Sequence, residues 1–195
     1  DTIQQTVLDA SNPLYDFKPD LIWIFTNYRD VPMNLPYGAS EKVCSDHLSF
    51  QINKIVAVWN TIKKNHPCQI IHNNADIPDS RILGNYEANV LWSRTNLLRQ
   101  FNLELSKVVS TGVTLFDLEH ISSLFGKDQW HEPRYWYHSK HAFSLDASGT
   151  VAIQAAKLIG AAKGLSKKCI VIDLDNTLWG GVIADDGIDG IELGY

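Results

Sequence analysis

Apolar runs of strand length alternate with stretches of helical periodicity along most of the chain. The run LIWIFTN is rich in β-branched and aromatic residues, which favour a buried strand. After it, apolar side chains recur at helical spacing, as in the series that contains Leu48, Ile52 and Trp59. The predicted strands cover 21–27, 68–74 and 113–119, and the predicted helices cover 40–65, 85–110 and 146–164.

This order of elements predicts the fold class. Strands that alternate with long helices form a parallel sheet, because each crossover helix returns the chain to the same end of the sheet and covers one of its faces. We therefore expect residues 1–164 to form one α/β domain with three layers. The short polar segment KGLSKK follows as a linker, and a new strand is predicted from Cys169. Residues 165–195 would then begin a second domain.

Composition and charge narrow the range of partners. The net charge is −5 and no run of Lys or Arg exceeds two residues, so the sequence lacks the basic surface that nucleic-acid binding requires. No apolar run reaches the roughly 18 residues that span a bilayer. Three cysteines without a CxxC pair indicate free thiols, and we expect a cytoplasmic protein. The only methionine is Met33, so the chain is expected to be an excised piece.

An aspartate pair ends the segment CIVIDLD. In a strand, residues i and i+2 point to the same side, so Asp173 and Asp175 would present their carboxylates together at the carboxyl edge of a sheet. One carboxylate can attack an electrophile while the other moves protons, and the pair can hold Mg²⁺, which offsets the charge of a bound phosphate. The alternative is a simple turn, in which Asn176 and Thr177 cap the next element.

The string DLDNTLW resembles the first motif of the haloacid dehalogenase-like (HAD) phosphotransferases, which follows a buried strand. The resemblance implies that Asp173 is the nucleophile and a Mg²⁺ ligand. It implies that Asp175 is the general acid and base, with its backbone carbonyl also on the metal, and that Thr177 orients the loop. The following GGVIADDGIDGIELG is similar to the flap of these Rossmann-like domains.

The longer string KKCIVIDLDNTLWGGVIADDGIDGIELG resembles the FkbH-like branch of this superfamily. Members of that branch are implicated in loading a glyceryl unit onto an acyl carrier protein, and relatives occur in polyketide and capsular polysaccharide biosynthesis. Their N-terminal domain is similar to SGNH hydrolases, with a flavodoxin-like three-layer sandwich. The resemblance extends over essentially the whole chain and includes FKPDLIWI and RTNLLRQFNLELS. A phosphorylated small molecule and a carrier protein are thus the implied partners. The remaining HAD motifs would lie beyond Tyr195, so this piece alone is expected to be inactive.

The resemblance also suggests a remnant of an SGNH site. Asn27 stands where an oxyanion donor is expected, and His141 stands where the catalytic histidine is expected. The GDS nucleophile is absent, and His138 replaces the usual aspartate. The alternative is that Asn27 caps a loop and that both histidines lie on the surface. A zinc site of His131, His138 and His141 is disfavoured, because the spacing is not helical and no cysteine supports it. An esterase or acyltransferase acting on glycan acyl groups, or a non-catalytic domain that binds a carrier or partner, therefore remains an alternative function.

Two further features have both structural and functional interpretations. The segment ILGNYEAN is predicted to be a strand exit followed by a helix start, with Asn85 as the cap, and either Asn85 or Glu87 could serve a site at the carboxyl edge. The segment WHEPRYWYHSKH is predicted to be a loop with dense aromatic residues. These side chains either form a contact surface or pack over the sheet edge or the second domain. They are Trp130, Tyr135, Trp136 and Tyr137.

Overall fold

The centre of the fold is a three-stranded parallel sheet, seen here in a computed structural model that describes residues 2–194. Its strands are β1 (Leu21–Ile24), β2 (Gln69–Asn73) and β3 (Val113–Phe116), in the order β1-β2-β3. Leu21 pairs with Gln69, and Ile70 pairs with Val113. The predicted parallel α/β sandwich is therefore confirmed, and all three predicted strands of the first domain are present.

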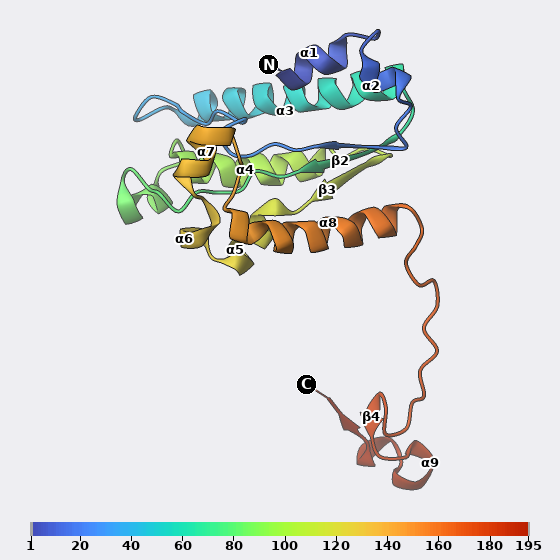
Figure 1. Ribbon diagram of the computed structural model, residues 1–195. Coiled ribbons are helices and arrows are strands. Elements are labelled where there is room, and N and C mark those ends of the chain that lie inside the picture. Colours follow the sequence, from blue (N-terminus) through green and yellow to red (C-terminus); the bar gives the residue numbers. More distant parts are fainter. Residues whose placement is uncertain (1, 195) are drawn as a thin grey trace. The chain divides into compact units, whose positions relative to one another are not determined.

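Helices cover both faces of this sheet (Figure 1). On one side lie α3 (Glu41–Asn65) and α4 (Arg94–Lys107), and α1 (Thr2–Leu8) packs against α3. On the other side lies α8 (Ser148–Ala162), which buries Val151 and Ala155. The shorter elements are α2 (Pro13–Asp16), η1 (Gly84–Asn89), α5 (Leu118–Phe125), α6 (Lys127–Trp130), α7 (Pro133–Ser139) and η2 (Leu145–Ala147).

Helix α3 agrees with its predicted bounds because both its start and its packing are encoded locally. The Ser40 side chain accepts a hydrogen bond from the Val43 N–H (3.4 Å), which caps the first turn. Along the helix, the apolar series places Trp59 and Ile62 in the core, where they are almost fully buried together with Phe101 of α4. Burial of such side chains contributes about 1.5–3 kcal/mol each.

Helix α4 begins later than the sequence predicts. Its N-cap is Ser93, which accepts a hydrogen bond from the Asn96 N–H (3.3 Å), whereas Asn85 lies in the 3₁₀ helix η1 and is not the cap of α4. Nor does a strand precede this segment. The prediction failed because the helical spacing of apolar residues does not distinguish a long helix from a 3₁₀ turn followed by a shorter one.

Glu87 holds this preceding segment together from the inside. Its carboxylate is buried and accepts hydrogen bonds from the Thr95 hydroxyl (2.5 Å) and the Ile82 N–H (2.8 Å). Burial opposes ionisation of Glu87, but the hydrogen bonds from Thr95, Leu83 and Ile82 outweigh it and lower its pKa. Glu87 is thus an organiser of the segment before α4, and its carboxylate oxygens are engaged by the protein itself.

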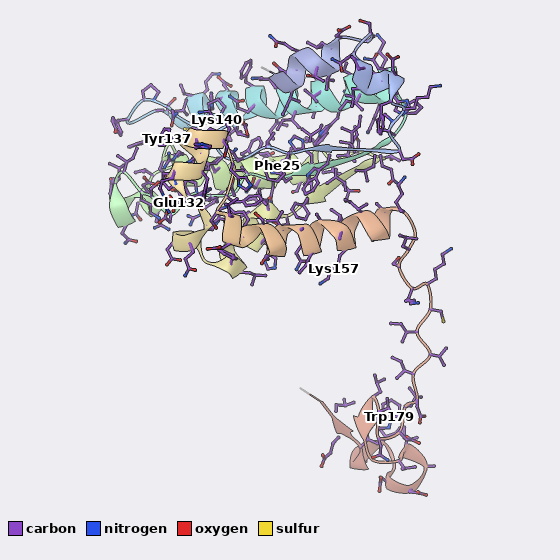
Figure 2. The ribbon with its side chains drawn as sticks, in the orientation of Figure 1. Phe25, Glu132, Tyr137, Lys140, Lys157 and Trp179 are labelled. Carbon is purple, nitrogen blue, oxygen red and sulfur yellow. The ribbon has the colours of Figure 1, made fainter. Side chains whose placement is uncertain are left out.

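The aromatic segment is not the predicted loop, because residues 133–139 form helix α7. Pro133 occupies the first turn, the Glu132 side chain accepts from the Arg134 N–H (3.2 Å), and Lys140 ends the helix in a left-handed conformation. The aromatic side chains of this segment differ in how deeply they are buried. Trp130 is fully buried and packs on Phe143, with ring centroids 5.1 Å apart. Tyr137 is 79% exposed (Figure 2).

The described residues divide into two compact units, one that ends at Ala156 and one that starts at Lys157. The second unit contains the antiparallel pair β4 (Trp179–Gly180) and β5 (Glu192–Leu193), with α9 (Ile183–Asp186) and η3 (Ile188–Gly190) between them. The strand predicted from Cys169 does not form, and Val171 is 93% exposed. A strand needs a neighbour to pair its N–H and C=O groups, and residues 2–194 supply none there.

We predict that Glu87→Gln destabilises the protein by about 1–3 kcal/mol. The amide N–H₂ group would face hydrogen-bond donors at a position where a carboxylate oxygen now accepts a hydrogen bond. Urea unfolding near neutral pH measures this loss. The pKa of Glu87 in the folded protein lies below its ordinary value of 4.5. The loss of stability should therefore be complete above pH 4.5 and should become smaller in more acid solution. Glu104→Gln, on the exposed face of α4, is the matched control and should change stability by less than about 1 kcal/mol. Equal effects of the two substitutions would contradict this account.

Candidate functional site

The carboxyl ends of the three strands carry a concentration of buried polar side chains. Asn73, the last residue of β2, pairs with both backbone groups of Thr26: its Oδ1 accepts from the Thr26 N–H (3.0 Å), and its Nδ2 donates to the Thr26 carbonyl. This fixes the chain that leaves β1 against the end of β2. Parallel sheets bind ligands at this edge, so it is the place to examine first. The buried polar residues there are Thr26, Asn27, His72, Asn73 and Asp76.

Asp76 joins three separate segments at this edge. It is 0% exposed, and its Oδ1 accepts a hydrogen bond from the Tyr28 N–H (3.0 Å) in the loop after β1. Its Oδ2 accepts from Trp130 Nε1 (2.8 Å) and lies 2.7 Å from His131 Nε2. The Tyr28 ring packs edge-on against the His131 ring, with centroids 5.0 Å apart. Both carboxylate oxygens of Asp76 are therefore occupied within the protein.

His72 is held in one tautomer by two neighbours. Trp59 Nε1 can only donate, and it lies 2.9 Å from His72 Nδ1, so Nδ1 accepts. His72 Nε2 therefore carries the proton and donates to Thr26 Oγ1 at 3.1 Å. Burial lowers the pKa of His72 to about 4, so the ring is neutral near pH 7. Because Nε2 donates, His72 cannot act as a base on the Thr26 hydroxyl.

The two residues of the predicted SGNH remnant line one cavity. Asn27 follows β1 and His141 follows α7, and both border a space of about 690 Å³ that Trp136 and Ser148 also line. Asn27 Oδ1 accepts from the Arg29 N–H (2.8 Å), and its Nδ2 has no hydrogen-bond partner among the described residues. His141 Nδ1 lies 2.7 Å from the Phe143 carbonyl and must donate to it, which leaves Nε2 available to accept.

The other histidines of this segment lie apart from that cavity. His138 is exposed on α7, and His131 pairs with Asp76. Residues 2–194 contain no group of three or more His, Cys, Asp or Glu side chains that could hold a metal ion. The sequence did not reveal the Asp76–His131 pair, because the two residues come from different loops and no motif joins them.

Asp173, Asp175 and Thr177 lie in the second unit. Asp173 is exposed, and its Oδ1 accepts from the Leu174 N–H (2.9 Å). Asp175 is half-buried, and its Oδ1 accepts from the Ile183 N–H (3.1 Å) and from the indole Nε1 of Trp179 (3.0 Å; Trp179 is labelled in Figure 2). Thr177 is exposed. The loop is therefore built around Asp175.

Asn176 closes the same loop. It has a left-handed backbone with φ of 54°, a conformation that asparagine adopts more readily than most residues. Its backbone N–H donates to the Gly181 carbonyl (3.2 Å), and its Oδ1 accepts from the Gly181 N–H (3.0 Å). This reciprocal pair fixes the turn that follows the two aspartates.

Comparison with known families agrees with the resemblance found in the sequence. The model of the FkbH N-terminal domain matches residues 1–159. The chain belongs to the FkbH family. No curated protein matches it at a significant level. In the residues that the structure describes, no helix is both long enough and apolar enough to cross a membrane.

A solved structure shares the fold of this FkbH chain. It is described as the N-terminal part of the protein BF1531 from Bacteroides fragilis, containing a phosphatase domain complexed with Mg. The two chains are 24% identical and superpose with a TM-score of 0.69. The match covers 100% of this chain and 51% of the other, so this chain spans about half the length of that protein.

The donor chemistry of the aspartate loop suits magnesium. Mg²⁺ prefers oxygen ligands and is commonly held by one or two carboxylates together with waters and substrate phosphate. In this FkbH chain Asp173 keeps one carboxylate oxygen without a hydrogen bond, and Asp175 Oδ2 is likewise unpartnered among the described residues. These two residues could hold the ion, although the described residues bring no third acidic ligand to them.

We predict that His72 makes the stability of the domain depend on pH. The folded pKa is about 4 and the ordinary value is 6.5, so the unfolded chain binds more protons between these values and stability falls as the pH falls through this window. Between about pH 7.5 and about pH 5 the contribution amounts to about 2 kcal/mol. His72→Gln keeps a donor and an acceptor but does not titrate, so its unfolding free energy should lack this part of the pH dependence. An NMR titration in which the His72 ring protonates near its ordinary pKa would contradict the prediction.

Proposed function

We propose that residues 169–194 open a HAD-type phosphotransferase domain, with Asp173 as nucleophile and Asp175 as general acid and base. The observation that carries this proposal is the string CIVIDLDNTLWGG directly after a domain that matches the FkbH family. The fold neighbour, a protein described as containing a phosphatase domain complexed with Mg, supports it. The catalytic unit would be completed in a longer protein, in keeping with the half-length match to that neighbour.

The two aspartates suit different roles because their surroundings differ. Asp173 is exposed, and among the described residues it is hydrogen-bonded only to its own neighbour, so an oxygen is left that could attack phosphorus and form an aspartyl-phosphate. Asp175 is anchored by Trp179 and Ile183 through Oδ1, which leaves Oδ2 to give a proton to the leaving oxygen and later to take one from water. Bound Mg²⁺ would offset the negative charge of the phosphate.

The finer assignments rest on the resemblance to the FkbH-like branch. We propose a phosphorylated small molecule as donor, a glyceryl or related acyl unit as the transferred group and an acyl carrier protein as acceptor. Polysaccharide or polyketide-type biosynthesis would be the context, and the cytoplasm the compartment. The free state of all three cysteines is compatible with that compartment.

A second candidate function has one specific observation in its favour, which is that Asn27 and His141 line the same cavity. An amide donor and an oriented imidazole are two of the parts that an esterase or acyltransferase needs. Ser139 and Ser148 are the hydroxyl groups that border this cavity, and Ser139 donates to the Tyr135 carbonyl (3.0 Å). Hydrolysis of an aryl acetate that disappears in His141→Gln would favour this function over phosphotransfer.

We predict that Asp173→Asn and Asp175→Asn each remove phosphotransfer in the full-length protein, for different reasons. The Asp173→Asn side chain would keep the shape but lose the attacking oxygen, so no phosphoenzyme should form. The Asp175→Asn variant would keep the nucleophile but could supply no proton, which should slow turnover by about 10²–10⁴. The loss at the first step should be smallest for an acyl phosphate, whose leaving carboxylate hardly needs a proton. Rapid-quench labelling with a phosphate donor measures both effects.

The matched control for this experiment is Asp186→Asn in the same unit, because Asp186 accepts the Val182 N–H (2.8 Å) in α9 but has no assigned chemical role. The 195-residue chain by itself should show no Mg²⁺-dependent turnover of an aryl phosphate above background, since its described residues gather no third acidic ligand. Label trapped on the Asp173→Asn protein, or full turnover in either variant, would refute the assigned roles.

A further inference from the structure

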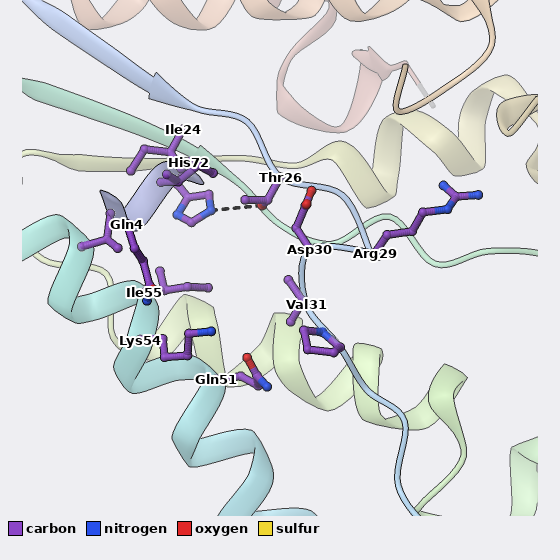
Figure 3. A pocket seen from close by; sticks show the side chains of 13 residues that line it. Gln4, Ile24, Thr26, Arg29, Asp30, Val31, Gln51, Lys54, Ile55 and His72 are labelled. Atoms are coloured by element: carbon purple, nitrogen blue, oxygen red, sulfur yellow. Dashed lines mark hydrogen bonds between the residues drawn. The ribbon is translucent and has the colours of Figure 1, made fainter. Parts of the chain in front are cut away.

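A second, separate cavity lies between the end of β1 and helix α3 (Figure 3). Its volume is about 390 Å³, within the usual range for small-molecule sites. The apolar part of its wall is aliphatic. Polar groups reach it from two sides, because Gln51 and Lys54 project from α3 toward the chain that leaves β1, where Thr26 lies. The aliphatic residues that line it are Ile3, Ile24, Val31, Ile55 and Val58.

Gln51 is the most unusual residue of this cavity. It is only 6% exposed, yet its side-chain amide has no hydrogen-bond partner among the described residues. The amide atoms of Gln51 are not among the fully buried side-chain atoms that lack a partner, so they open onto the cavity. At the same helical face Leu48 and Ile52 are buried, so an apolar residue would satisfy the packing. The amide therefore presents a donor and an acceptor to whatever occupies the cavity.

Thr26 supplies a second unused donor. Its Oγ1 already accepts the proton from His72 Nε2 (3.1 Å), because Trp59 fixes the tautomer of that ring. The hydroxyl proton of Thr26 itself has no acceptor among residues 2–194. Thr26 is buried and borders the cavity, so this proton is available to an oxygen atom placed there.

Lys54 gives the cavity a positive charge. It forms no ion pair with the described residues, and its Nζ lies 5.8 Å from the centroid of the Phe50 ring. The other two charged residues of the wall, Asp30 and Arg29, carry opposite charges. Asp30 Oδ2 accepts the Asn27 N–H (2.9 Å) within its own turn. The Arg29 guanidinium lies over the rings of Tyr28 (4.4 Å) and Trp136 (4.5 Å).

From these groups we infer that the cavity is a binding site for a small aliphatic monocarboxylate. Lys54 and the Gln51 N–H₂ group would hold the carboxylate, the Thr26 hydroxyl would donate to one of its two oxygens, and the aliphatic residues would enclose the chain. Together with Lys54, the charges of Arg29 and Asp30 give the wall a net charge of +1, which matches a single negative charge. A phosphate dianion would exceed this net charge, and part of its own charge would lose its water without a counterpart.

This site does not depend on the proposed phosphotransfer, because all of its residues belong to the first unit and none is an aspartate of the 173–175 pair. Binding can thus be tested without any enzymatic assay. Failure of the binding experiment would leave the phosphotransfer proposal untouched, and loss of phosphotransfer in the aspartate variants would leave this site untouched.

The test is the binding of butyrate to the 195-residue chain, measured by saturation-transfer NMR and by the thermal shift, with inorganic phosphate as the competing anion. Gln51→Leu and Lys54→Met should each weaken butyrate binding about 10-fold to 100-fold, since each removes a hydrogen bond to a charged group. Lys64→Met, an exposed lysine on the same helix, should bind as the unchanged chain does.

Each result of this experiment either supports or overturns the proposed site. Loss of butyrate binding in both cavity variants, with the Lys64→Met control unchanged, supports the site. The inference is overturned if butyrate does not bind, if either cavity variant binds it as tightly as the unchanged chain, or if phosphate binds as tightly as butyrate. Lys54→Met keeps the test decisive if Gln51→Leu proves difficult to fold.

Discussion

The buried carboxylate of Asp76 is the constraint on which the carboxyl edge of the sheet depends. A carboxylate with no exposure must have its oxygens paired, because an unpaired buried charge costs several kcal/mol. Its three partners come from the loop after β1 and from the segment at the end of α6. The hydrogen bonds to the Asp76 carboxylate therefore fix the positions of both segments. They also fix the walls of the cavity that Asn27 and His141 share.

Asn73 extends the same constraint to the neighbouring strand. Its side chain pairs with both backbone groups of Thr26, so the chain leaving β1 continues beside β2 after the regular ladder has ended at Ile24 and His72. Backbone groups that would otherwise be buried without partners are thereby satisfied. The loop after β1 can then bury polar residues on one side of the sheet edge and border a cavity on the other side. Thr26 lies in this loop and therefore borders the space beside α3.

The sequence predicted those features of the fold that local signals determine. The three strands and helix α3 follow from continuous apolar runs, helical spacing and the cap at Ser40. The start of α4 was wrong, because the segment before it is organised by the buried Glu87, a tertiary contact that periodicity cannot reveal. The strand at Cys169 was also wrong in this chain, because strand propensity is realised only beside a pairing partner.

Prediction of the candidate sites had a similar limit. Motif position alone pointed to Asn27 and His141, which the fold brings to one cavity, and to the aspartate pair. The chemical roles of all four residues stay predictions. The Asp76–His131 pair and the tautomer of His72 depend on contacts between distant segments, so no local pattern indicates them. Gln51 did leave a signal, namely a polar residue on the buried face of an amphipathic helix, next to Ile52.

The partnering of buried polar groups separates structural residues from binding residues in this domain. Asp76, Glu87 and His72 are buried and engaged by protein partners, so the protein alone explains them. Gln51 is buried to a similar extent and bears an amide that no described residue engages. This amide is not fully enclosed and opens onto the cavity beside α3, where a ligand can pair with it. Its position beside an unpaired lysine and an unused hydroxyl proton is therefore better explained by a ligand than by the fold.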